Sequence, residues 1–92
     1  MKTIQNQNPQ SKMASTDFQC PIIDACATGA HIEELCKAGG YTPTMLCAAL
    51  GLSATQSIYH WYRGRCLPSL DNLYALARLM HVHMDDFLVE AA

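Results

Sequence analysis

Glycine and proline signals divide most of the chain into short segments that have the apolar spacing of helices. Gly39-Gly40 follows one such segment, predicted over residues 28–38, because glycine accepts the left-handed conformation that ends a helix. Thr42-Pro43 then supplies a cap and a first-turn proline for a second helix over residues 43–50, which Gly51 stops. No alternating apolar pattern is longer than a few residues. The sequence therefore predicts an all-α fold.

Three more helices are predicted from similar signals. Ser53 and Gln56 fit the S-x-x-Q capping box that starts a helix, and Gly64 is expected to end that helix. Pro68-Ser69 provides the next start, with Asp71 in the first turn where it suits the helix dipole. These helices are expected over residues 55–62, 69–80 and 84–89. The expected architecture is a compact five-helix domain.

Each predicted helix has an apolar side, which identifies the expected core. Ile58 and Trp61 point to the same side of the third helix at about 100° per residue, so Trp61 is interpreted as a core anchor and not as a side chain that stacks on bases. The other predicted core residues are Ile32, Leu35, Cys36, Met45, Leu46, Ala49, Leu50, Leu70, Leu73, Tyr74, Ala77 and Met80.

Length and composition limit the chain to one small domain. Its 92 residues are 50% apolar and 15% charged, which is a globular composition. Residues 1–20 are rich in Gln, Asn, Ser and Thr and are predicted to form a flexible N-terminal arm, and residues 21–92 the folded domain. No activated nucleophile or phosphate-binding loop is visible, so we expect no enzyme and no small-molecule substrate.

The sequence gives little support to a membrane, secretory or metal-binding role. Its longest stretch without Asp, Glu, Lys or Arg, residues 38–62, is interrupted by glycine and proline. The N-terminus lacks the apolar region of a signal peptide, which favours a cytoplasmic protein with reduced thiols. Cys20, Cys26, His31 and Cys36 lack the close pairs of a zinc site, so no metal or other cofactor is expected.

Charge is unevenly distributed along the chain. The net charge of −2 argues against a protein that coats nucleic acid non-specifically. Residues 35–70, however, contain no Asp or Glu and three cationic residues, Lys37, Arg63 and Arg65. A surface that faces phosphates needs this local sign more than a basic total.

The second and third predicted helices form a helix-turn-helix arrangement, in which the later helix enters the DNA major groove. Gly51 allows the sharp turn, and Leu52 supplies an apolar residue that holds the pair together. Gln56 and His60 are the first candidates for base contacts, since a glutamine can form a bidentate pair with adenine. The complete predicted DNA-binding set is Thr44, Thr55, Gln56, Ser57, Tyr59, His60, Arg63 and Arg65.

The order of these signals resembles the XRE family of lambda repressor-like and Cro-like helix-turn-helix domains. The similar elements are Leu50-Gly51-Leu52-Ser53, then Ile58 and Trp61, then Arg63-Gly64 with Pro68-Ser69, the stripe from Leu73 to Met80, and Asp85-Asp86-Phe87-Leu88. The resemblance implies a lambda repressor-like fold and a bacterial or phage transcription regulator of the repressor type. Its partner would be double-stranded DNA.

A homodimer is expected, because one such module contacts only half of a two-fold operator. The predicted dimer surfaces are the last helix, with Met84, Phe87 and Val89, and the N-terminal arm. An alternative function is an antitoxin-like or other protein-binding module with weak or no DNA binding. The net charge of −2 and the Pro43-Thr44 pair, at a position where the family usually has a long polar residue, favour this alternative.

Overall fold

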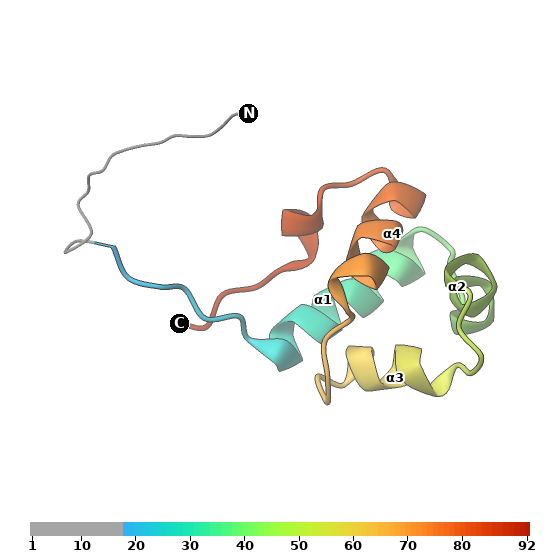
Figure 1. Cartoon of the computed structure of the whole chain (residues 1–92), viewed down its shortest axis with the longest axis horizontal. Coiled ribbons are helices and arrows are strands. Elements are labelled where there is room, and N and C mark those ends of the chain that lie inside the picture. Colours follow the sequence, from blue (N-terminus) through green and yellow to red (C-terminus); the bar gives the residue numbers. More distant parts are fainter. Residues whose placement is uncertain (1–17) are drawn as a thin grey trace.

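Four α-helices and one 3₁₀ helix form the described part of the chain, residues 18–92, in a computed structural model (Figure 1). The elements are α1 (Ala25–Ala38), α2 (Pro43–Leu50), α3 (Gln56–Tyr62), α4 (Leu70–Met80) and η2 (Met84–Phe87). The all-helical prediction is confirmed, but the expected fifth α-helix is a 3₁₀ helix. Most of the predicted N-terminal arm lies outside the described residues.

Local capping explains where three of the helices begin. The Asp24 carboxylate accepts a hydrogen bond of 2.9 Å from the Ala27 amide, so α1 starts three residues before the predicted position. Thr42 caps α2 with a proline in the first turn, and Ser69 caps α4. Each side-chain oxygen satisfies an amide that the helix itself leaves unpaired.

The predicted capping box at Ser53 does not form. The residue before α3 is Thr55, whose φ of −69° and ψ of −14° are already helical, and no side chain caps the helix there. Ser53 is two residues too early in the chain to meet the first-turn amides. The helix nevertheless covers nearly the predicted range.

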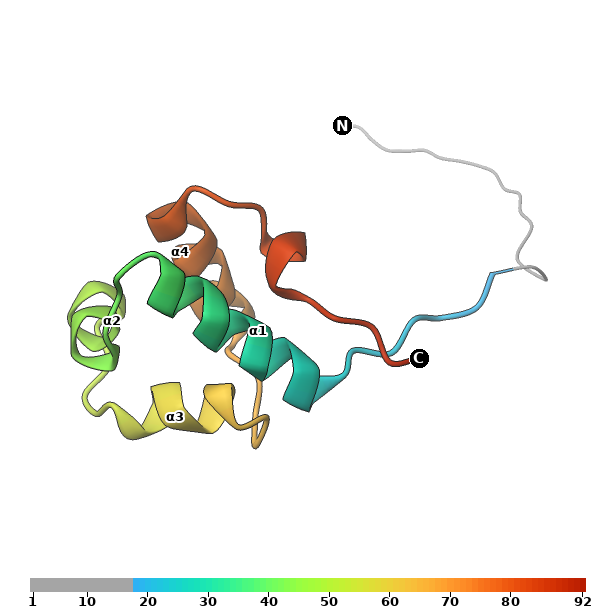
Figure 2. The same ribbon diagram turned by 180° about the vertical axis from the view of Figure 1, so that it is seen from behind.

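The last predicted helix stops early because its C-terminal part pairs with the start of the described chain. Beyond Met84–Phe87 the backbone becomes extended. The Asp24 amide donates to the Val89 carbonyl and the Ala91 amide to the Ile22 carbonyl, each at 2.8 Å. These bonds between distant parts of the sequence replace the helical bonds expected up to Val89. Figure 2 shows the two extended segments side by side at one end of the molecule.

The core draws at least one side chain from each element. Trp61 is 4% exposed, as predicted for a core anchor, and Phe87 is fully buried. The burial of Phe87 corrects its assignment to a dimer surface. The fully or almost fully buried hydrophobic side chains are Ile32, Cys36, Leu46, Ile58, Leu76 and Phe87.

Some residues predicted to lie in the core are exposed instead. Met45 and Ala49 face outward because the short α2 buries only Leu46 and Cys47. The buried side of α4 runs through Leu73, Leu76 and Ala77, and the prediction had not included Leu76. The buried side of α4 is therefore rotated about the helix axis relative to the predicted apolar stripe. Leu70 and Tyr74, which were predicted to be buried, are 73% and 52% exposed.

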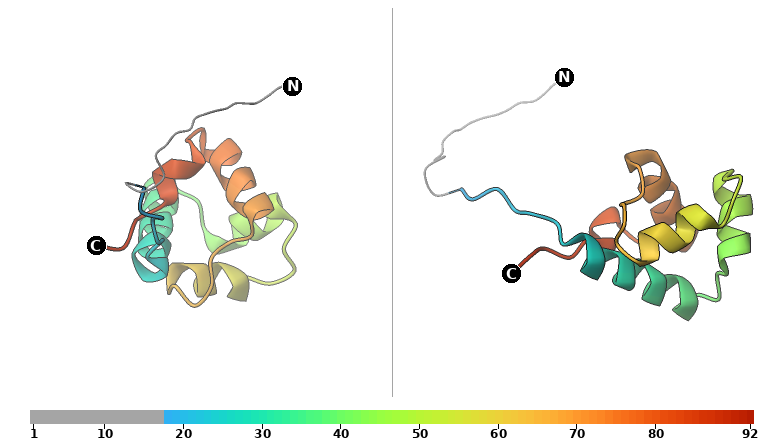
Figure 3. Two further views of the ribbon diagram at one scale, coloured as in Figure 1. Left: turned by 60° about the vertical axis from the view of Figure 1, so that its left-hand side comes forward. Right: turned by 90° about the horizontal axis from the view of Figure 1, so that it is seen from below.

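Two glycines let α1 approach the C-terminal end of α3 closely. A Cβ atom on Gly29 would lie 2.0 Å from the Trp61 carbonyl oxygen, and one on Gly64 would lie 2.6 Å from the Cα of Cys26. Gly64 also has a φ of +73°, which few other residues adopt. Both panels of Figure 3 show the first turn of α1 beside the segment that follows α3. This contact with α1 supports the buried side of α3 at its C-terminal end.

Candidate nucleic-acid interface

The connection between α2 and α3 is the tight turn that the sequence predicts. Gly51 adopts a left-handed conformation with a φ of 71°, and its amide bonds to the Cys47 carbonyl. The Leu52 amide bonds to the same carbonyl at 2.9 Å, and its side chain packs against the core. The two helices therefore form a helix-turn-helix unit.

Helix α3 separates its apolar and polar residues onto opposite sides. Ile58, Trp61 and Tyr62 are buried against the rest of the protein. Gln56 and Tyr59 are exposed, and Arg63 is exposed at the C-cap. The expected inward aromatic side and outward polar side are both present.

Most of the predicted DNA-binding residues surround one shallow hollow of about 370 Å³. Of the predicted set, only two lie outside it: Thr44, which is exposed on α2, and Ser57, which is half-buried on α3. We call this surface the α3 hollow. It is lined by Thr55, Gln56, Tyr59, His60, Arg63 and Arg65.

Aromatic contacts hold part of the α3 hollow in place. The ring of Tyr59 meets the buried ring of Tyr62 edge to face, with the ring centres 6.2 Å apart. Tyr59 has a second contact, with Arg63, whose guanidinium carbon lies over the Tyr59 ring at 5.9 Å from the ring centre. A cation over an aromatic face loses less conformational freedom when it binds an anion. Tyr59 thus orients Arg63.

The charges of the α3 hollow are unopposed by acidic groups within residues 18–92. Neither Arg63 nor Arg65 forms an ion pair there, whereas Lys37 pairs with Glu33 at 2.9 Å. No Asp or Glu lines the hollow. The cationic character predicted for residues 35–70 is therefore concentrated at the two arginines.

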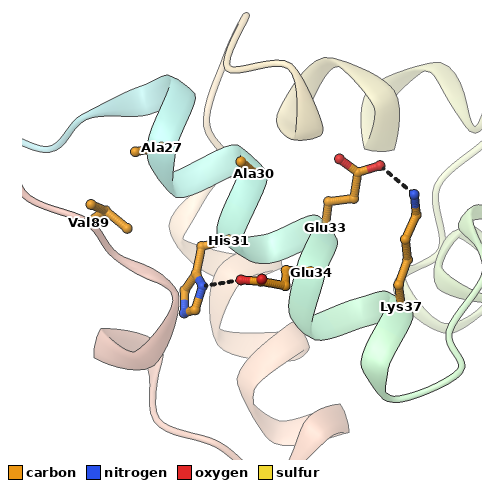
Figure 4. A pocket seen from close by; sticks show the side chains of 7 residues that line it. All are labelled: Ala27, Ala30, His31, Glu33, Glu34, Lys37 and Val89. Atoms are coloured by element: carbon orange, nitrogen blue, oxygen red, sulfur yellow. Dashed lines mark hydrogen bonds and ion pairs between the residues drawn. The ribbon is translucent and has the colours of Figure 1, made fainter.

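A larger hollow of about 520 Å³ lies on the outer side of α1 and has a different chemistry. Figure 4 shows two side-chain pairs in it, the hydrogen-bonded His31 and Glu34 and the ion pair of Glu33 with Lys37. Two carboxylates on its walls oppose the approach of a phosphate, and its lysine, Lys37, is already paired with Glu33. The smaller α3 hollow is thus the better candidate for nucleic acid.

Neither a membrane span nor a metal cluster is found among residues 18–92. None of their helices is long and apolar enough to cross a bilayer. No three of their His, Cys, Asp or Glu side chains are close enough to hold a metal ion. Cys20, Cys26 and Cys66 are exposed, and Cys36 and Cys47 are buried.

Sequence interpretation missed two residues that determine how α1 packs: Gly29 lies against α3, and Thr28 against the C-terminal segment. Gly29 was not recognised, although a glycine inside a helical pattern often marks a close packing contact. Thr28 is fully buried, and its hydroxyl accepts a bond of 2.9 Å from the Val89 amide, which ties the C-terminal segment to α1. A threonine in the first turns of a helix gives no comparable signal.

Comparison with known proteins supports the same interpretation of the fold. The helix-turn-helix family HTH_3 matches residues 32–87, from the middle of α1 to the end of η2. A crystal structure of the restriction-modification controller protein C.AhdI from Aeromonas hydrophila has a similar fold, with a TM-score of 0.61 and 24% sequence identity. The similarity covers 68% of this chain and 94% of that protein. No curated protein sequence matches the chain.

Proposed function

Because this chain belongs to the HTH_3 helix-turn-helix family, we propose that it is a sequence-specific transcription regulator of the repressor type. In this proposal α3 lies in the major groove and α2 crosses the DNA backbone. The structurally similar C.AhdI is a controller protein, which agrees with a regulatory role.

The observation that carries this proposal is the α3 hollow. It combines polar side chains one helical turn apart, Gln56 and His60, with two arginines that have no acidic neighbour in the hollow. A helix with its side chains is about 10–12 Å in diameter, which fits a major groove about 12 Å wide, and the seven residues of α3 extend about 10 Å along it. Gln56 and His60 would then reach base edges, and the arginines would hold phosphates on either side.

The remaining predicted residues have supporting roles in this arrangement. Thr44 is exposed near the start of α2, where it would meet the DNA backbone. Tyr59 orients Arg63 and is itself 43% exposed, and Thr55 and Ser57 lie at the start of α3. We further propose that the protein binds two half-sites as a homodimer, because one α3 reads only a few base pairs.

The direct test is selection of bound duplexes from random DNA, followed by titration of the selected duplex. The double substitution Gln56→Ala and His60→Ala should weaken binding at least about tenfold, since each lost base contact costs about 1–3 kcal/mol. The same double substitution should change the affinity for a duplex of scrambled sequence only slightly, because binding to that duplex depends on phosphate contacts, which the substitution leaves in place.

The matched control is His31→Ala together with Gln19→Ala, which changes the same residue types outside the α3 hollow. Circular dichroism and thermal unfolding verify that both variants fold. If the Gln56 and His60 variant kept its affinity for the selected duplex, α3 would not be the reading helix.

A protein-binding function is the second candidate. The uncharged, partly apolar surface of α2 favours it. This helix contains no charged residue, and Met45 on its surface is 50% exposed. A helix that crosses the DNA backbone usually contributes phosphate contacts. Failure of the folded protein to enrich any duplex at low salt would favour this alternative over DNA binding.

A further inference from the structure

An apolar surface on the outer side of α4 is exposed within residues 18–92. Leu70 is 73% exposed, Tyr74 is 52% exposed, and Leu67 just before the helix is 39% exposed. Leu70 and Tyr74 are one helical turn apart, so their side chains are neighbours on the same side of α4. We call Leu67, Leu70, Tyr74 and Arg78 the α4 face. Large apolar side chains gathered in this way often mark an interaction surface.

A hollow of about 400 Å³ lies at the C-terminal end of the α4 face, away from Leu67 and Leu70. Tyr74 and Arg78 form one wall, and Val82 and Met84 from the following segment contribute apolar atoms to it. Its complete lining is Tyr74, Ala77, Arg78, Val82, His83, Met84 and Asp85. One helix therefore carries a protruding leucine near its N-terminus and a receiving hollow near its C-terminus.

This arrangement is complementary to itself. In a two-fold dimer, if one residue contacts a second residue of the partner, the reverse contact forms as well. Leu70 and Arg78 are equally far from Tyr74 along α4. When two α4 helices pack antiparallel with Tyr74 near the two-fold axis, Leu70 of each copy therefore enters the hollow of the other.

The charges of α4 fit the same antiparallel packing. Asp71 is exposed in the first turn and Arg78 in the last turn, and neither forms an ion pair within residues 18–92. Antiparallel pairing places each Asp71 beside the partner's Arg78. Arg78 is already oriented, since its guanidinium donates a hydrogen bond of 3.0 Å to the Tyr74 hydroxyl and lies 5.8 Å from the centre of that ring.

We propose that the α4 face binds a second copy of this chain, with the two α4 helices antiparallel about a two-fold axis. The proposal rests on the DNA-binding function, for which a dimer supplies two reading helices. The residues that line the α4 hollow and the α3 hollow do not overlap, so dimerisation leaves α3 available. One helix pair buries less surface than a standard interface of about 1,600 Å². The dimer is therefore weak and dissociates on dilution.

Sedimentation equilibrium of the full chain without DNA tests this surface. Leu70→Glu should raise the dimer dissociation constant at least about tenfold, because it replaces the apolar side chain that contacts Val82 and Met84 of the partner with a charged one that must lose its hydration. Ile22→Glu is the matched control, since Ile22 is 70% exposed but lies at the paired termini. This control should dimerise like the wild type, and thermal unfolding verifies that both variants fold.

A charge exchange distinguishes a contact between copies from a structural effect within one copy. Asp71→Arg and Arg78→Asp should each weaken the dimer, and the double variant should recover to within about threefold of the wild type. The two residues are two helical turns apart in one copy, so only a partner can restore the pair. The proposal is overturned if the double variant remains as weak as the single variants.

Two further outcomes would also overturn it: a wild-type chain that stays monomeric at all concentrations, and an Ile22→Glu variant that loses the dimer while Leu70→Glu keeps it. In either case, titration of the protein with a duplex that contains a single half-site tests the DNA-binding function separately, because a monomer is sufficient to bind one half-site. Loss of half-site binding in Gln56→Ala with His60→Ala would then still support α3 as the reading helix.

Discussion

Tyr62 combines two opposing demands at the base of the interface. Tyr62 is 7% exposed, and its ring supports Tyr59, which in turn orients Arg63. Its buried hydroxyl has no hydrogen-bond partner within residues 18–92 and lies beside the Cys36 thiol, a weak hydrogen-bonding group. Burial raises the pKa of the Tyr62 hydroxyl and also that of the Cys36 thiol. The ring stabilises the site, whereas the hydroxyl costs desolvation energy.

Tyr62→Phe should therefore leave the free energy of unfolding unchanged or raise it by up to about 1 kcal/mol, because it removes an unpaired polar group and keeps the ring. Urea denaturation at neutral pH measures this change. A loss of more than about 1 kcal/mol would show that the hydroxyl makes a stabilising bond.

The same substitution has a consequence at alkaline pH. An unfolded tyrosine has a pKa of about 10, and the pKa of Tyr62 in the folded chain is higher. As the pH rises above about 10, the unfolded state loses this proton while the folded state keeps it, so stability falls. Tyr62→Phe should lose less stability than the wild type between about pH 9 and pH 11. Equal losses in the two proteins would contradict the assigned cause.

At the scale of elements, the orientation of α3 depends on its crossing with α1. Gly29 and Gly64 allow the two backbones to approach, and the Cys26 thiol donates a long bond of 3.9 Å to the Arg63 carbonyl. The side chains of Trp61 and Tyr62 add buried contacts on the same side of α3. A shift of this crossing would move both arginines of the α3 hollow.

Gly29→Ala tests this crossing, because the expected change in the free energy of unfolding is opposite to the usual one. Alanine in place of glycine inside a helix normally stabilises by up to about 1 kcal/mol. Here the added Cβ would lie 2.0 Å from the Trp61 carbonyl oxygen, so we expect destabilisation of about 1–3 kcal/mol and weaker DNA binding. Thermal unfolding and titration of the selected duplex measure the two effects. A gain in stability would show that α1 and α3 are not in close contact.

At the scale of the whole molecule, a net charge of −2 is compatible with DNA binding because two of the six Lys and Arg residues line the α3 hollow with no acidic residue of the described chain beside them. Arg63 and Arg65 line the α3 hollow, while Lys37 is paired with Glu33 on α1 and Arg78 lies on α4. Few cations face the proposed DNA site. Affinity should therefore depend only moderately on salt.

Each phosphate contact contributes about −0.9 to the slope of log affinity against log salt concentration. Replacing both Arg63 and Arg65 by Gln should therefore reduce the slope by about 2 per subunit. Lys37→Gln is the control and should change it little, because Lys37 already pairs with Glu33. Titration of the selected duplex at several salt concentrations measures the slopes. A wild-type slope that implies eight or more phosphate contacts per subunit would contradict this distribution of charge.

The sequence alone determined the features that depend on neighbouring residues. Thr42 with Pro43 and Ser69 mark the starts of α2 and α4 because a cap acts on amides two or three positions away. Gly51 determines the turn into α3 through its own backbone conformation. The spacing of Ile58 and Trp61 determines which side of α3 faces inward, and hence which residues can face DNA.

Only the tertiary structure decided the features that depend on distant residues. The last helix ends at Phe87 because the following segment bonds to Ile22 and Asp24, far away in the sequence. Tyr74 and Leu70 are exposed because the packing of α4 rotated its buried side toward Leu76. Backbone pairing and core packing are energies of the assembled chain, so periodicity within one segment does not contain them.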